Sequence, residues 1–374
     1  MKILAIDIGT GTQDILFFDS QKTIENSIKM VMPAPTVIAS QRITKATHSR
    51  MPLAITGVNM GGGPVTQALR QHLKAKLPVY ATISAATTFD DDMEIVRDMG
   101  VTLVDEADIY SMNGVTTVDL RDLDLKMIRQ SIAAFGVEPD WDALAVAVFD
   151  HGNAPPGYSD RKFRFDHLRD QVQHGERRIN SFSYLPEEIP NYMTRMLSVV
   201  KVTDPDTPIL LMDTAEAAVL GALEDKIVAA QEYKVVANIG NEHTLAFYLR
   251  GEIIQGIFEH HTHILNKTRL ESYLKDLVTG DIDNDEVWEN QGHGSIVIGS
   301  GQMLEFISVT GPMRRMLEGS HINPYFATPH GDMMLAGSFG LIRAWAEKNE
   351  DWQEEIMSSL RNPDTITPKD FHPH

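Results

Sequence analysis

Cysteine is absent from the 374-residue sequence. Its absence excludes disulfide bonds, thiolate-held iron–sulfur clusters and a cysteine nucleophile. Basic residues are also scarce, since 33 lysines and arginines stand against 52 acidic residues and leave a formal net charge of −19. A strongly acidic chain is repelled by a phosphate backbone, so we expect no nucleic-acid partner.

Long hydrophobic runs are missing as well. No apolar stretch approaches the about 20 residues that a helix needs to cross a bilayer. The apolar run at the N-terminus contains Asp7, which is unlike a signal peptide. We therefore expect no membrane association and a cytoplasmic protein.

A glycine-rich turn stands near the start, in "ILAIDIGTGTQDILFFD" at residues 3–19. A dinucleotide-binding or P-loop motif requires a helix directly after such a turn. Here Asp14 occupies the place of a third glycine, and an apolar run rich in strand formers follows at residues 15–18. This pattern predicts a β-hairpin with Gly9 and Gly11 at its tip. A helix is the alternative that so short a run leaves open.

The same unit recurs from Lys234, in "KVVANIGNEHTLAFYLRGEIIQGIFEH". Each copy reads as a strand, a polar turn, a second strand and a third alternating segment, with Asp7 aligned to Asn238 and Gly9 to Gly240. Any two hairpins share some of these features, which is the alternative explanation. Two copies, one opening each half, predict a duplicated fold with a cleft between the halves.

This arrangement resembles the actin-like ATPase superfamily, which includes acetate and sugar kinases, heat-shock chaperone ATPases and actin. The resemblance implies an α/β, duplicated two-domain ribonuclease H-like fold with a nucleotide cleft between the domains. We expect a first domain at residues 1–205, a second at 206–362 and a loosely ordered tail at 363–374. The first would carry one phosphate loop and the expected substrate loops, and the second the other phosphate loop and the adenosine segment.

Three further segments fit this resemblance. Residues 307–309 form an apolar strand that runs into Thr310-Gly311-Pro312, with a helix expected to start at Pro312. Residues 210–223 would form a connecting helix, and a helix starting near Gly331 would close the fold.

The resemblance also implies roles for particular residues. Asp7 would meet a Mg²⁺ ion through water, and Gly311 would let adenosine lie against the backbone. For Asp7, capping of its own turn is the structural alternative. The phosphates of ATP would lie against the backbone of Gly9, Thr10, Gly11, Thr12, Gln13, Gly240, Asn241 and Glu242.

One residue departs from the superfamily pattern. The second phosphate loop normally begins with an aspartate, whereas this chain has Asn238. Asparagine accepts a hydrogen bond from metal-bound water but brings no charge. Mg²⁺ binding should be weaker unless Glu242 supplies the missing carboxylate, and fast phosphoryl transfer is in doubt.

The segments "NMGGGPV", "DHGNAPPGYSDRKFRF" and "FEHHT" resemble a narrower, uncharacterised family of actin-like ATPases from archaea and bacteria, often labelled as pyruvate formate-lyase activating enzymes. That label conflicts with the sequence, because a radical SAM activase needs three cysteines for its iron–sulfur cluster. The cysteine-dependent activators of radical dehydratases are excluded for the same reason.

Two loops are candidates for binding a substrate. Gly61, Gly62 and Gly63 lie between a strand and an amphipathic helix, where they form either an anion or substrate loop or a flexible turn. Asp150, His151 and Asn153 follow a buried-type strand, where α/β sheets present their chemistry. Asp150 is the candidate general base, and anchoring of the proline-rich loop is the alternative.

Histidines gather in Glu259-His260-His261-Thr262-His263. We expect His260 and His261 to contact the substrate, while a metal bound by the cluster at residues 260–263 is an alternative. Arg161, Lys162 and Arg164 form a local basic cluster that suits an anionic substrate or partner, or a solvated surface.

The sequence thus favours a phosphotransferase or ATPase that binds Mg-ATP and acts on an unidentified small substrate in the interdomain cleft. The alternative is a nucleotide-sensing regulator or activator with little turnover. A metal-dependent hydrolase using the His260–His263 cluster is a third hypothesis. A homodimer or a protein partner is left open.

Overall fold

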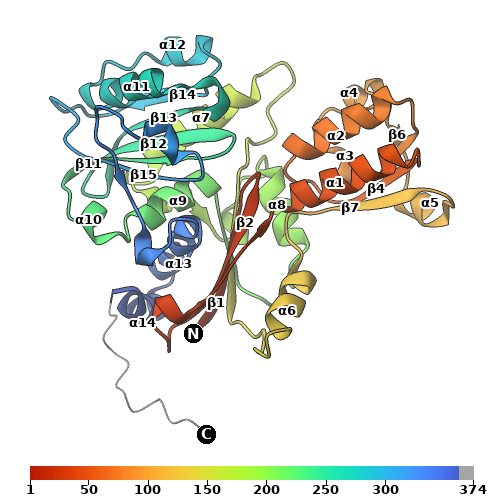
Figure 1. The fold of residues 1–374 in the computed structure, drawn as a ribbon, viewed down its shortest axis with the longest axis horizontal. Helices are drawn as coiled ribbons and strands as arrows, with labels where there is room; N and C mark the ends of the chain where they lie inside the picture. Colours follow the sequence, from red (N-terminus) through yellow and green to blue (C-terminus); the bar gives the residue numbers. More distant parts are fainter. Residues whose placement is uncertain (362–374) are drawn as a thin grey trace, which may run out of the picture.

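The computed structural model describes residues 1–361, so the tail expected from residue 363 lies outside the described residues. The chain forms two six-stranded sheets and a smaller four-stranded sheet, which projects to the right in Figure 1. Among the helices of residues 1–361, none has both the length and the apolar character that a membrane span requires.

The first sheet has the strand order β3-β2-β1-β8-β10-β9. Its central strands are almost wholly buried and apolar, as expected for parallel strands covered on both faces. β1 pairs with β2 antiparallel and with β8 parallel, and β8 pairs with β10 parallel. The strands are β1 (Lys2–Ile8), β2 (Thr12–Asp19), β3 (Ile28–Pro33), β8 (Ala143–Val148), β9 (Ser183–Tyr184) and β10 (Ile209–Met212).

The second sheet repeats this arrangement, in the order β14-β13-β12-β11-β15-β16. β11 pairs with β12 antiparallel and with β15 parallel, and β15 pairs with β16 parallel. Five strands of each sheet thus share one spatial order, two antiparallel pairings followed by two parallel ones. The sixth strands, β9 and β14, pair antiparallel at opposite edges. The strands are β11 (Tyr233–Ile239), β12 (His243–Arg250), β13 (Ile253–His261), β14 (Gly294–Val297), β15 (Ile307–Thr310) and β16 (Tyr325–Phe326).

The two predicted hairpins are confirmed, and their turns share the same hydrogen bond. Gly9 N–H donates to Thr12 O, and Gly240 N–H donates to His243 O, both at 2.9 Å. Neither Gly9 nor Gly11 has a positive φ, so conformational freedom is not why glycine stands there. The helix left open for residues 15–18 does not form, because β2 pairs along its whole length with β1.

The third sheet is inserted after β3 and has the all-parallel order β6-β5-β4-β7. The predicted strand and amphipathic helix on either side of the three glycines are β4 and α2. The elements are α1 (Pro35–His48), β4 (Leu53–Gly57), α2 (Gly63–Lys74), β5 (Val79–Ala81), α3 (Ile83–Ala86), α4 (Met93–Asp98), β6 (Thr102–Leu103), α5 (Glu106–Ser111) and β7 (Thr116–Leu120).

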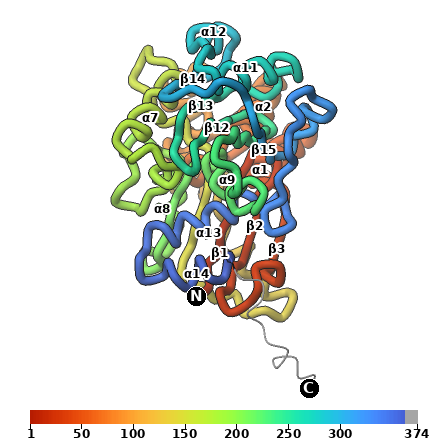
Figure 2. The backbone as a smooth tube through the Cα atoms, turned by 90° about the vertical axis from the view of Figure 1, so that its left-hand side faces the viewer, coloured from red at the N-terminus to blue at the C-terminus, as the bar shows by residue number. Residues whose placement is uncertain are grey.

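The remaining helices cover the two large sheets. α9 and α13 contribute to one hydrophobic core that both sheets share, while α6 and α8 pack on the other face of the first sheet and α11 on the other face of the second. Figure 2 shows α14 beside the N-terminus at one end and α11 and α12 at the other. These helices are α6 (Leu125–Ala133), α7 (Asp160–His174), α8 (Thr194–Lys201), α9 (Thr214–Ala222), α10 (Lys226–Ala229), α11 (Lys267–Thr279), α12 (Asn284–Glu289), α13 (Ala336–Lys348) and α14 (Glu350–Arg361).

Two helix predictions need correction. The helix expected over residues 210–223 begins only at Thr214, because residues 209–212 form the parallel strand β10 and Asp213 caps the helix by accepting from Ala215 N–H at 3.2 Å. The helix expected from Pro312 is a single 3₁₀ turn at Arg314–Leu317. Residues 209–212 are an apolar run too short for periodicity to separate strand from helix.

The halves also share residues across the boundary expected at 205. β10 completes the first sheet, and α13 returns to it from the far end of the chain. Trp345 on α13 donates its indole N–H to Leu144 O of β8 at 2.8 Å. The first half is therefore built from residues 1–212 together with the two C-terminal helices.

α9 and α13 cross at glycines. A Cβ on Gly221 would overlap Ala336 O, and one on Gly340 would overlap Ala217 O. The two backbones thus meet without an intervening side chain, which fixes the distance between the helices that join the halves (Figure 1).

The substitution Gly340→Ala should lower the free energy of unfolding by roughly 1–3 kcal/mol, because the new methyl group must push the two backbones apart. The matched control is Gly63→Ala, where the nearest atom to the new Cβ lies at 4.0 Å. Urea denaturation measures both variants. An equally small effect at the two positions would contradict the close crossing.

Candidate functional site

The two hairpin turns face each other across a cavity between the halves. A Cβ on Gly11 would lie only 2.6 Å from Asn241 Nδ2, so glycine is needed for the close approach of the turns. We call this space the hairpin cavity. Its lining includes Asp7, Gly9, Thr10, Thr12, Asp14, Arg195, Thr214, Asn238, Gly240, Asn241, Glu242, His243, Gly311, Pro312, Met333 and Gly337.

Two carboxylates stand side by side in the hairpin cavity. Asp7 and Asp14 are direct partners in the β1–β2 register. Asp7 accepts a hydrogen bond from Thr214 Oγ1 at the start of α9. Thr12 Oγ1 donates to Asp14 Oδ2 at 3.4 Å, while Asp14 Oδ1 is buried without a hydrogen-bond partner among the described residues.

Burial raises the pKa of Asp7 to about 7 and that of Asp14 to about 8, and the neighbouring Asp7 adds to the second shift. Arg195 also lines the cavity, but Asp122 holds its guanidinium at 2.7 Å and 2.9 Å. Within residues 1–361 neither carboxylate therefore has a cationic side chain that compensates its charge, and the donor set of carboxylate oxygens fits Mg²⁺.

The equivalent positions in the second half carry no charge. Asn238 aligns with Asp7, and its register partner is Leu245, which is fully buried. Asn238 Oδ1 accepts from Thr310 Oγ1 at 3.5 Å. A cation site built from carboxylates therefore belongs to the first half alone, with Glu242 at the exposed rim.

The end of β15 closes the hairpin cavity. Gly311 has φ +91°, and a Cβ there would overlap Ile239 O, so only glycine fits. Gly311 N–H lies 3.2 Å from Met333 Sδ. Pro312 and Met333 give this end an apolar surface suited to a flat ring.

A second space, which we call the glycine-loop cavity, adjoins the first. Gly9, Thr10, Phe149, Arg195, Glu242 and His243 line both. Its other lining residues include Thr36, Asn59, Gly61, Gly62, Gly63, Asp91, Asp150, His151, Thr194, His261 and His263.

Hydrogen bonds hold the three-glycine loop in place. Thr36 Oγ1 donates to Gly61 O at 2.7 Å, and Gly61 N–H donates to Asp122 Oδ1 at 3.2 Å. A Cβ on Gly61 would lie 2.7 Å from Arg195 Nη2. These contacts pack Gly61 closely against the cavity wall, and substrate binding by this loop stays a prediction.

The carboxylate of Asp150 is hydrogen-bonded to backbone N–H groups. Its carboxylate accepts N–H hydrogen bonds from Gly152 at 2.9 Å, Arg195 at 3.0 Å and Met196 at 2.9 Å. Burial raises its pKa, and the hydrogen bonds from Met196 and Gly152 act in the opposite direction. This geometry favours the anchoring alternative, in which Asp150 fixes the first turn of α8 and hence Arg195.

Not all predicted substrate residues reach a cavity. His151 and His261 line the glycine-loop cavity, but Asn153 is exposed and lies outside both linings. His260 is fully buried against Phe258 and Tyr273, because side chains alternate along β13 and this one points into the core. Gln13 also points away, donating from Nε2 to Pro33 O at 3.1 Å.

The expected basic cluster does not form a common surface. Arg164 is buried and pairs with Asp213 at 2.7 Å and Glu259 at 3.0 Å. Arg161 instead lies over the ring of Trp288, with its Cζ 4.1 Å from the ring centroid, and Lys162 lies over the same ring. Arg164 is thus separated from the other two basic residues, because its guanidinium is buried among carboxylates.

Sequence reasoning missed three residues of the cavity linings, Asp14, Arg195 and His243, and also His293, which is buried beside His151 and His243. Asp14 could have been placed from the register of the hairpin. With a two-residue turn at the tip, the residue seven positions after Asp7 pairs with it across the two strands. His243 follows the second turn directly and could have been placed in the same way. Arg195 and His293 come from other elements, and only the folded chain brings them in.

The repeated strand order and the two facing hairpin turns define this class of protein: a duplicated ribonuclease H-like fold of the actin-like ATPase type, as the sequence predicted. A family model described as "Putative pyruvate format-lyase activating enzyme (DUF1786)" matches residues 60–316, and the chain belongs to this family. No protein with curated annotation matches the chain.

Solved structures give more distant similarities. The activator of 2-hydroxyisocaproyl-CoA dehydratase from Clostridium difficile, solved with ADPNP, is 10% identical, with 95% of this chain and 98% of that chain covered and a TM-score of 0.36. A ROK hexokinase from Thermus thermophilus is 13% identical, with 93% and 100% covered and a TM-score of 0.31. A ROK-family transcriptional regulator, a homologue of the E. coli MLC protein, is 10% identical with a TM-score of 0.27; 68% of this chain is covered, but the match spans only 38% of the regulator's length.

The raised pKa of Asp14 makes stability depend on pH. Between the ordinary value of 3.8 and about 8, the folded chain binds more protons than the unfolded chain, so stability falls as pH rises through this window. Asp14→Asn should therefore raise the free energy of unfolding by on the order of 2 kcal/mol near pH 8, with little gain near pH 5.

Urea denaturation at the two pH values, without divalent cations, measures this difference. Asp140→Asn is the control, because Asp140 is exposed in a loop. A gain from Asp14→Asn that does not change between the two pH values would contradict the buried, uncompensated carboxylate.

Proposed function

We propose that the hairpin cavity binds Mg-ATP and that the chain is a phosphotransferase or ATPase. The observation that carries this proposal is the uncompensated pair Asp7 and Asp14 between two facing hairpin turns. Buried carboxylates without a cationic partner are costly, and a bound cation would remove that cost.

The turns would hold the phosphates through main-chain N–H groups. The N–H groups of Gly9 and Gly240 already close their own turns, so we assign this role to Thr10 and Gly11 on one side and to Asn241 and Glu242 on the other. This set of phosphate-binding residues is narrower than the one expected from the sequence. Gln13 is left out because its side chain points toward Pro33 O. Gly311 and the apolar surface beside it would receive the adenosine.

Asp7 and Asp14 would hold the magnesium ion through water, with Thr214 orienting Asp7. When bound, the ion neutralises charge on the phosphates. Asp14 is a second residue proposed to hold the magnesium ion, since the sequence-based assignment named Asp7 alone. With Asn238 uncharged, this pair supplies the negative charge that Asn238 lacks.

The second substrate would lie in the glycine-loop cavity, which shares Gly9, Thr10 and Glu242 with the hairpin cavity. A molecule there would be adjacent to a terminal phosphate held by the turns. Phosphoryl transfer needs mainly positioning and charge neutralisation. We therefore assign Asp150 to positioning α8 and Arg195 rather than to proton transfer.

A regulator or activator that binds the nucleotide with little turnover is the second candidate. Asn238 favours it, because only one half supplies carboxylates to the ion. Release of ADP on addition of candidate substrates separates the two: sustained release supports the transferase, and binding without release supports the regulator.

The family description implies a radical-activating enzyme, and such an enzyme depends on an iron–sulfur cluster. The chain contains no cysteine, so its residues do not fit a thiolate-held cluster. We therefore propose no radical step for this chain.

Asp7→Asn tests the magnesium assignment. Asparagine keeps the acceptor for Thr214 but removes the charge, so the affinity for a non-hydrolysable ATP analogue with Mg²⁺ should fall roughly tenfold or more. Isothermal titration calorimetry with and without Mg²⁺ measures the change.

The matched control is Asn153→Ala, which changes an exposed residue in the loop after β8, outside both cavity linings. It should bind like the parent. If Asp7→Asn retained full magnesium-dependent affinity, the ion would have to lie elsewhere.

A further inference from the structure

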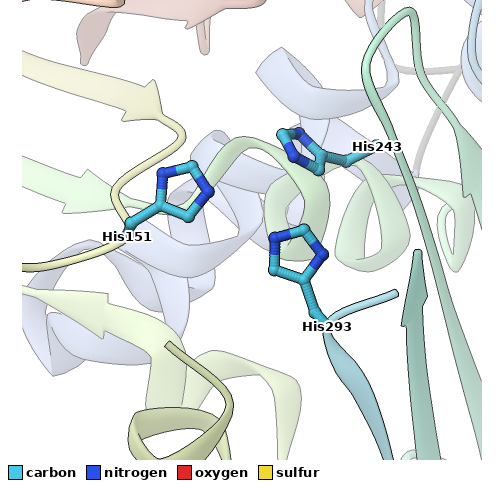
Figure 3. A group of neighbouring side chains, drawn as sticks. All are labelled: His151, His243 and His293. Atoms are coloured by element: carbon cyan, nitrogen blue, oxygen red, sulfur yellow. The ribbon is translucent and has the colours of Figure 1, made fainter. Parts of the chain in front are cut away.

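Three histidines meet at the boundary between the hairpin cavity and the glycine-loop cavity. His151 follows β8 in the first half, His243 opens β12 and His293 precedes β14 in the second half. One ring nitrogen from each lies within 4.8 Å of the others. Figure 3 shows the three rings turned toward one common point.

Three imidazole nitrogens at this point have no hydrogen-bond partner within residues 1–361. Both ring nitrogens of His293 and Nε2 of His243 are buried without a hydrogen bond among the described residues. Leaving a buried polar atom unpaired costs about 1–3 kcal/mol. Several such atoms that converge on one point indicate a shared ligand.

The positions of the rings are fixed by their surroundings. His243 stacks on Phe149 with ring centroids 4.1 Å apart and an interplanar angle of 4°. The backbone of His293 donates its N–H to Glu259 O at 3.0 Å, which continues the β13–β14 pairing. His243 and His293 are therefore held at strand ends of the second sheet, while His151 lies in the loop that follows β8.

Burial of the three imidazoles favours their neutral form, which is the form that binds a metal ion. Burial lowers the pKa of His151 to about 3, and it also lowers the pKa of His243 and of His293. Arg164 lies nearby, but its guanidinium is paired with Asp213 and Glu259, whose carboxylates offset its charge.

From this geometry we propose that His151, His243 and His293 bind a divalent transition-metal ion of the Zn²⁺ type. Three nitrogen donors suit zinc, cobalt, nickel or copper, whereas magnesium requires oxygen. Zinc bonds of about 2.0–2.1 Å place tetrahedral ligand atoms roughly 3.3 Å apart, so the rings need to move inward by about 1 Å.

Three protein ligands leave a coordination position open. His151 and His243 line the glycine-loop cavity, so this position would face the space proposed for the second substrate. A substrate with an oxygen donor, such as a carboxylate or hydroxyl group, would fit there. Because His151 comes from one half and His243 and His293 from the other, the ion would also link the two halves.

This site is distinct from the metal cluster suggested by the sequence at residues 260–263, of which only His261 comes near. The ring centroid of His261 lies 4.9 Å from that of His243 and 4.8 Å from that of His293, but His261 is outside the three-histidine group. His260 points into the core, and His263 is exposed on the rim of the glycine-loop cavity. His263 therefore offers a matched control: a histidine of the same cavity that lies outside the three-histidine group.

The test uses the full chain stripped of metal with a chelator and titrated with Co²⁺. We expect about one ion per chain, visible absorption bands of tetrahedral cobalt with nitrogen ligands, and displacement by Zn²⁺. His151→Gln and His293→Gln should each weaken binding roughly tenfold or more, while His263→Gln should bind like the parent.

Circular dichroism checks that each variant folds. If the two variants fail to fold, X-ray absorption of the zinc-loaded parent protein counts the ligands directly, and three imidazoles are expected. Failure of the parent to bind Co²⁺ or Zn²⁺ stoichiometrically would overturn the proposal. So would binding that survives both glutamine substitutions, loss of binding in His263→Gln, or a zinc ion with oxygen ligands only.

Neither result depends on nucleotide. Binding of Co²⁺ by a protein that fails to bind Mg-ATP would support the three-histidine site and refute the proposed function. Binding of Mg-ATP without binding of Co²⁺ would support the proposed function and refute the three-histidine site.

Discussion

The crossing of α9 and α13 through Gly221 and Gly340 is the contact on which the rest of the structure depends. α9 begins at Thr214, whose hydroxyl donates to Asp7, and a Cβ on Gly337 of α13 would overlap Asp7 Oδ2. α13 also contacts β2, the second strand of the first hairpin, where Ser338 Oγ donates to Asp14 O at 2.7 Å. The two helices that join the halves therefore also fix both carboxylates of the candidate site.

Duplication of the fold has not produced two equal sites. The two turns keep the same hydrogen bond, yet the first half places Asp7 and Asp14 where the second has Asn238 and Leu245. The second half contributes histidine instead: His243 begins β12 directly after its turn. The asymmetry gives the cleft a carboxylate side and an imidazole side, which suit ions of different chemistry.

Much of this arrangement was predictable from the sequence, because it depends on local patterns. The hairpins at Gly9 and Gly240 follow from apolar runs broken by glycine, and their repetition predicts the duplicated fold. One error comes from a short apolar run, residues 209–212, because such runs form strands or helices according to their neighbours, which local sequence does not specify. His293 and Arg195 enter the site through tertiary packing, as does the burial that turns Arg164 from a surface charge into the centre of an ion-pair network.

A crystal structure of the protein with Mg²⁺ and a non-hydrolysable ATP analogue tests the central claim most directly. The account predicts the terminal phosphates between Thr10–Gly11 and Asn241–Glu242, the magnesium ion beside Asp7 and Asp14, and the adenine near Gly311. A nucleotide bound outside the hairpin cavity, or one whose metal ion lies away from both carboxylates, would contradict it.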